Sequence, residues 1–178
     1  MDTKKLEKIC SSICFRYINH KLIYPQKIGN MKYMIIYPTD GFYLTEKQYS
    51  SIFNVIKEQS ENEYFISDIE FKDSFSKGEK SDDLGYMHRK HTSFSYDNYI
   101  NETLLFEYAI YDVKGFWGIS VFQDYYAIIC GSEKLIESVR KNYSNVVDKQ
   151  RFEELLQTPQ YIDKAFKEKM TELISKSQ

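Results

Sequence analysis

Two of the three histidines stand close together and have the clearest potential for chemistry. His88 and His91 are three positions apart, a spacing at which two imidazoles can share a helical face and bind one metal ion. Asp82 and Asp83 lie just upstream and could supply oxygen ligands. Two basic residues lie between the histidines, and their charge opposes a bound cation. The pattern allows a metal-dependent enzyme of unfamiliar type, whereas the charges favour a mixed-charge surface loop.

The three cysteines are the next reactive groups. Cys10 and Cys14 are four positions apart on one face of an expected helix, and Cys130 follows far downstream. No second pair has the spacing of a zinc site, so we interpret the cysteines as small apolar residues of the core. An odd, low cysteine count without a secretory signal favours reduced thiols and a cytoplasmic protein.

The other polar residues form no catalytic pattern. Glu102 and Glu107 are an odd number of positions apart, so a strand that held both would place them on opposite faces. The chain has no nucleophile elbow, phosphate-binding glycine loop or dinucleotide fingerprint. Gly131 and Ser132 precede an expected helix whose first N–H groups could hold an anion, but a strand exit with an N-cap is the simpler interpretation. We predict no catalytic residue, metal site or cofactor.

The first third of the chain predicts two helices and a strand. Apolar residues recur every three or four positions over residues 2–18, which indicates an N-terminal helix. Residues 31–37 are rich in Met, Ile and Tyr and indicate a strand. Thr45 and Gln48 have the spacing of a capping box, which predicts a second helix.

The middle of the chain is polar and acidic. A strand is expected at residues 64–71, and residues 72–98 are expected to form a long polar loop, a feature that tends to be functional or disordered. Residues 58–83 contain nine acidic residues against three lysines. This charge repels nucleic acid and suits a basic protein partner. The candidate contact residues are Asp68, Glu70, Asp73, Glu79, Asp82, Asp83 and Tyr96.

Residues 104–130 give the clearest structural pattern, a three-stranded antiparallel meander. Its expected strands are residues 104–112, 116–122 and 125–130. Gly115 lies where the first turn needs a positive φ. Ser132 then caps a helix, and residues 132–176 are expected to form a C-terminal helical segment.

The middle strand of the meander has one bulky and one small face. Trp117, Ile119 and Val121 alternate on the bulky face, which predicts a buried Trp117. Gly118 and Ser120 make the other face small. That small face leaves room for a closely packed helix or for a partner.

Residues 115–132 resemble a pattern of small bacterial immunity-type proteins. The pattern is a strand with Trp-Gly, a tight turn, and a strand that leaves through Gly-Ser into a helix. The resemblance implies a protein that neutralises a toxin by direct binding, with a rigid acidic surface that fills a basic site. It implies no shared catalytic residues.

Length and composition set the fold class. The chain has 178 residues, of which 42% are hydrophobic and 16% aromatic, enough for one domain over residues 1–178. We predict an α+β fold with an antiparallel sheet of four to five strands around the central meander, flanked by N-terminal and C-terminal helices. No apolar run approaches the roughly 20 residues that span a bilayer, so no membrane association is expected.

The functional hypothesis is a non-enzymatic binding protein. It would be an immunity or inhibitor protein of bacterial or phage origin that contacts a basic toxin through an acidic surface. Two alternatives stay open. One is a metal-dependent enzyme that uses the loop of His88 and His91. The other is an accessory protein that forms homo-oligomers through its C-terminal helix.

Overall fold

The fold is built around a six-stranded antiparallel sheet with strand order β3-β8-β7-β6-β4-β5. The computed structural model describes residues 2–18, 21–59, 63–68, 88–102, 104, 107–122 and 126–143, and the single residues 154, 157, 168 and 171. The strands are β3 (Lys32–Ile36), β4 (Tyr64–Asp68), β5 (His88–His91), β6 (Tyr108–Asp112), β7 (Trp117–Phe122) and β8 (Tyr126–Gly131). The predicted meander is therefore confirmed as β6, β7 and β8 within the sheet, but its first strand begins at Tyr108 and not at residue 104.

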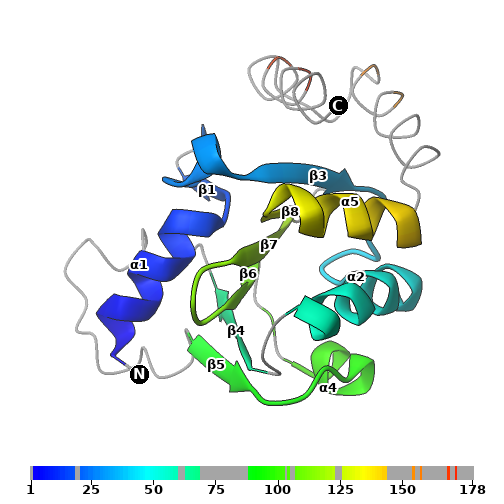
Figure 1. Ribbon diagram of the computed structural model, residues 1–178, viewed down its shortest axis with the longest axis horizontal. Helices are drawn as coiled ribbons and strands as arrows, with labels where there is room; N and C mark the ends of the chain where they lie inside the picture. Colours follow the sequence, from blue (N-terminus) through cyan, green and yellow to red (C-terminus); the bar gives the residue numbers. More distant parts are fainter. Residues whose placement is uncertain are drawn as a thin grey trace.

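Helices cover both faces of this sheet (Figure 1). One face carries α1 (Thr3–Ile13), and the other carries α2 (Glu46–Gln59), α4 (Tyr96–Ile100) and α5 (Glu133–Asn142). The α1 side buries a small cluster with residues of β4 and β6, and the other side buries a larger cluster with residues of all three helices. The predicted α+β class is confirmed. No helix of the described residues is both long and apolar enough to cross a bilayer.

The expected count of four to five strands is wrong, because β5 is the sixth strand of the sheet. It lies within the stretch 72–98, so the prediction of one long polar loop fails at residues 88–91, which form β5, and at residues 96–98, which begin α4. Residues 72–87 lie outside the described part of the chain. Strand β5 is an edge strand with the sequence HRKH, and charged side chains are typical of edges. A search for apolar alternation does not detect such a strand.

The N-terminal helix is shorter than predicted. It begins after the N-cap Asp2 and ends at Ile13, and residues 16–18 form β1 (Arg16–Ile18), which pairs with β2 (Lys21–Ile23). Phe15 explains the change of direction, because its side chain is buried against two tyrosines. Its ring centroid lies 5.5 Å from that of Tyr24 and 5.6 Å from that of Tyr33. Tertiary packing thus overrides the helical period after the first eleven helical residues.

The other two predicted helix starts are confirmed. The backbone N–H of Thr45 donates to Gln48 Oε1 at 2.9 Å, and the N–H of Gln48 donates to Thr45 Oγ1 at 3.3 Å, which is a capping box. Ser132 caps α5 by accepting the N–H of Leu135 at 3.2 Å. Beyond residue 143 only the four single residues are described, and all four are helical.

The small face of β7 receives helix α1. A Cβ atom on Gly118 would lie 2.6 Å from Cys14 Sγ and 3.0 Å from the carbonyl oxygen of Ile13. Only a glycine allows this approach, so the predicted room on this face holds a helix. Cys10, Cys14 and Cys130 are all buried free thiols, in agreement with their interpretation as core residues.

Candidate functional site

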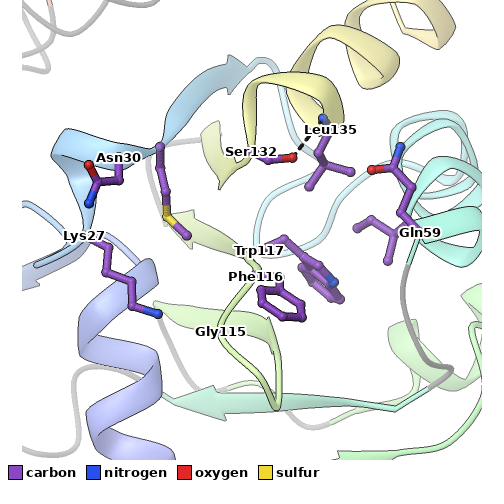
Figure 2. Close-up of a pocket in the computed structure, with 10 residues that line it drawn as sticks. Lys27, Asn30, Gln59, Gly115, Phe116, Trp117, Ser132 and Leu135 are labelled. Carbon is purple, nitrogen blue, oxygen red and sulfur yellow. Dashed lines mark hydrogen bonds between the residues drawn. The ribbon is translucent and has the colours of Figure 1, made fainter.

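A pocket of about 370 Å³ opens where four segments meet: the loop before β3, the end of α2, the β6–β7 turn and the start of α5 (Figure 2). The loop supplies Lys27 and Asn30, and α2 supplies Gln59. The turn supplies Phe116, and Ser132 stands at the start of α5. This volume is near the lower end of the roughly 300–1,000 Å³ of ligand sites.

The β6–β7 turn holds the aromatic wall of the pocket in place. Gly115 has φ +71, as predicted, and its N–H donates to the carbonyl oxygen of Asp112 at 3.0 Å. The side-chain atom Asp112 Oδ2 accepts the N–H groups of Lys114 and Phe116, both at 3.1 Å. Phe116 is nevertheless 63% exposed. A large aromatic side chain is thus presented to solvent on a backbone with little freedom.

Trp117 lines the pocket from within the core. It is only 2% exposed, and its ring meets that of Phe53 edge-on with the centroids 6.0 Å apart. This confirms its predicted burial. Its indole Nε1 has no hydrogen-bond partner among the described residues. Buried Trp N–H groups usually have one.

The cationic side of the pocket is anchored through its backbone. The N–H of Lys27 donates to the carbonyl oxygen of Ser12, and the N–H of Asn30 donates to the carbonyl oxygen of Lys27, both at 3.0 Å. The amine Nζ of Lys27 lies 3.5 Å from the point where a Cβ of Gly115 would be, so it reaches over the turn. Lys27 forms no ion pair with a carboxylate of the described residues.

The described lining contains a cation, amides and a hydroxyl, but no histidine, cysteine or carboxylate. It therefore provides hydrogen-bond donors and apolar surface, and lacks a general base or a thiol nucleophile within the described residues. Such a lining suits the binding of a ligand that has an acceptor group beside an apolar one.

The two candidate metal-binding histidines do not share a face. His88 Nδ1 lies 2.6 Å from Ser67 Oγ and 3.3 Å from the hydroxyl oxygen of Tyr111, on the α1 side of the sheet. The ring of His91 stacks on Tyr64 of the opposite cluster at 4.9 Å. The shared helical face that the spacing allowed does not form, because both histidines lie on β5 and residues three apart on a strand point in opposite directions. No group of three ligands that could hold a metal occurs among the described residues, which exclude Asp82 and Asp83.

Two of the seven predicted contact residues are described, and neither is an open surface residue. Asp68 is 6% exposed and forms an ion pair with Arg89 at 2.8 Å. Tyr96 is half-buried, packs on the core and donates its hydroxyl to the carbonyl oxygen of Leu44 at 3.3 Å. The other five residues, Glu70, Asp73, Glu79, Asp82 and Asp83, lie outside the described residues.

From the sequence, Phe116 was assigned to a strand and was not named as a candidate contact residue. One signal was available: alternation places Phe116 on the side of Gly118 and Ser120, opposite the bulky face of Trp117, Ile119 and Val121. Lys27 and Gln59 carried no signal, since only the fold brings them together.

Comparisons of the chain with protein-family models, with curated proteins and with solved structures gave no match.

Proposed function

We propose that this protein is a binding protein of the immunity or inhibitor type, which acts by occupying the surface of a partner protein. The observation that carries the proposal is the exposure of Phe116, at 63%, on a turn that Asp112 fixes beside a pocket. Aromatic anchors next to pockets supply much of the affinity of protein interfaces. A rigid anchor also loses little conformational entropy on binding.

The partner's chemistry follows from two parts of the chain. The described wall of the pocket offers apolar surface and donors, which suit a protruding side chain of the partner. The acidic residues of 58–83, apart from Asp68 and Glu63, which pair with Arg89 and Lys90, suit a basic surface on the same partner. A toxin with a basic site is the partner that the resemblance to immunity-type proteins implies.

The test is a capture experiment with matched aromatic variants. Wild type, Phe116→Ala and Phe42→Ala are used as baits in cells that produce the protein natively. Phe42 is 39% exposed and does not line the pocket, so it controls for the loss of an exposed ring. We expect a protein that wild type and Phe42→Ala retain and that Phe116→Ala loses. The same proteins on all three baits would overturn the binding function.

The inhibitor type is tested separately with the captured protein. Production of that protein alone should arrest growth, and co-production of the wild-type chain should restore it. The Phe116→Ala variant should restore growth poorly. A captured protein that has no toxic or enzymatic activity for wild type to suppress would leave a binding protein of another type.

A further inference from the structure

We infer that the pocket recognises a carboxylate: it takes an aspartate or glutamate side chain, with an apolar neighbour, from a segment of the partner protein. The inference rests on the proposed function, because it names which part of the partner enters the pocket. It follows from the charge of the lining, from an unused buried donor and from the size of the apolar wall.

The charge of the lining calls for an anion. Lys27 is the cation of the described lining, and no carboxylate there balances it. Asn30 and Gln59 add side-chain amides at the rim. A carboxylate would meet an ammonium group and neutral donors, and a charge-assisted hydrogen bond is about twice as strong as a neutral one.

The start of α5 faces the same pocket. The first N–H groups of a helix have no intrahelical partner and favour negative charge. Ser132 Oγ accepts the N–H of Leu135, which leaves its hydroxyl hydrogen able to donate. Glu133 is the one acidic residue in the first turn of α5, and it does not line the pocket. Its Oε1 lies 3.7 Å from Lys32 Nζ.

Trp117 supplies an independent observation, a buried donor that the described residues leave unused. Its indole N–H is buried and has no acceptor among the described residues, and Figure 2 shows the ring in the wall of the pocket. Phe116 and Gln59 are exposed side chains of the same lining. An acceptor on the entering segment that reached the indole N–H would satisfy this donor.

The apolar wall sets the neighbour of the acidic residue. The apolar part of the lining consists of two aromatic and three aliphatic side chains: Phe116, Trp117, Met31, Ile56 and Leu135. A volume of about 370 Å³ suits one or two side chains and excludes a whole helix. An acidic residue beside a leucine or similar side chain matches both halves of the lining.

The experiment uses the single tryptophan of the chain as its reporter. Because Trp117 lines the pocket, occupancy changes its fluorescence, and the probes contain no tryptophan. The full-length protein is titrated with acetyl-Leu-Glu-Leu-amide, with its glutamine counterpart acetyl-Leu-Gln-Leu-amide, and with acetyl-Leu-Leu, which has only a terminal carboxylate. We expect saturable binding of the glutamate peptide, at least about tenfold tighter than that of the other two.

Variants connect the signal to the site. Lys27→Ala should weaken binding of the glutamate peptide about tenfold, and Lys141→Ala, an equal loss of charge at the far end of α5, should leave it unchanged. Lys27→Arg should restore most of the binding. Equal affinity for the glutamate and glutamine peptides, preference for acetyl-Leu-Leu, or no saturable binding would each overturn the carboxylate inference.

The two proposals fail in different ways. If Phe116→Ala loses the captured partner but the glutamate peptide does not bind, the binding function stands and the carboxylate inference falls. If the peptide binds and Phe116→Ala captures the same proteins as wild type, the pocket is a carboxylate site and the proposed function falls.

Discussion

The side chain of Asp112 accepts the backbone N–H of Phe116 at 3.1 Å, across the turn from β6 to β7. Asp112 is 2% exposed, whereas Phe116 is 63% exposed. A carboxylate within the sheet therefore fixes the backbone of a side chain that points into solvent. Water competes little for this bond on the buried side, which strengthens it.

The first prediction concerns this bond. Asp112→Asn replaces a charged acceptor by a neutral one, so we expect a loss of about 1–2 kcal/mol in the free energy of unfolding. The turn should also open more often, and trypsin should cleave faster after the exposed Lys114. Urea unfolding and timed proteolysis measure the two effects. Asp97→Asn, at an exposed position of α4, is the control, and an equal loss there would contradict the assignment.

Local patterns predicted the parts of the fold in which burial follows sequence spacing. The middle strand of the meander could be predicted because Trp117, Ile119 and Val121 alternate with small residues. The start of α2 could be predicted because Thr45 and Gln48 have the spacing of a capping box. Strand β5 was missed because an edge strand of histidines and basic residues has no apolar alternation.

The pocket could not be predicted by the same means. The polar and aromatic lining comes from segments far apart in the chain, which supply Lys27, Gln59, Phe116 and Ser132. In its own segment, each of these is an ordinary surface or cap residue. Only the packing of α1 on Gly118 and of α5 on the sheet brings them together. The sequence indicated that the helix start after Gly131 and Ser132 could hold an anion. It did not indicate that Lys27 and Gln59 lie across the pocket from it.

The second prediction concerns the contact of β7 with α1. Gly118→Ala puts a Cβ 2.6 Å from Cys14 Sγ, so α1 must shift, and we expect a loss of about 1–3 kcal/mol in unfolding free energy. Gly29→Ala is the control, since nothing lies within 4 Å of its Cβ position. Adding Cys14→Ala should recover part of the loss by removing the sulfur. Urea unfolding that shows no recovery would point to the Ile13 carbonyl as the obstacle.

The third prediction concerns the buried tyrosines between α4 and the sheet. The hydroxyl of Tyr99 accepts the N–H of Leu44 at 2.8 Å and forms a hydrogen bond with the hydroxyl of Tyr108. Tyr99→Phe leaves a buried N–H without an acceptor, which should lower the unfolding free energy by about 1–3 kcal/mol. Tyr96→Phe removes a weaker, part-buried bond of 3.3 Å and should have a smaller effect in the same urea titration. Equal effects would show that the Leu44 N–H finds another acceptor.

The last prediction concerns pH and His91. Burial lowers the pKa of His91 below its usual value of 6.5, while Glu102, 3.2 Å away, raises it and Arg89 lowers it. The unfolded chain therefore binds a proton at this position more readily than the folded chain. The contribution of neutral His91 to stability is present above the unfolded pKa and is lost as the pH falls through the lower folded pKa.

Unfolding free energies of wild type and His91→Gln, measured from about pH 7.5 to about pH 5, test this sign. Wild type should lose stability relative to the variant as the pH falls below about 6.5, because glutamine has no proton to gain. Carboxylates that titrate alike in both proteins cancel in the difference. A wild type that gains relative stability at low pH would mean that the attraction of Glu102 outweighs burial. Parallel curves would mean that the opposing causes cancel and that His91 acts only through its stacking on Tyr64.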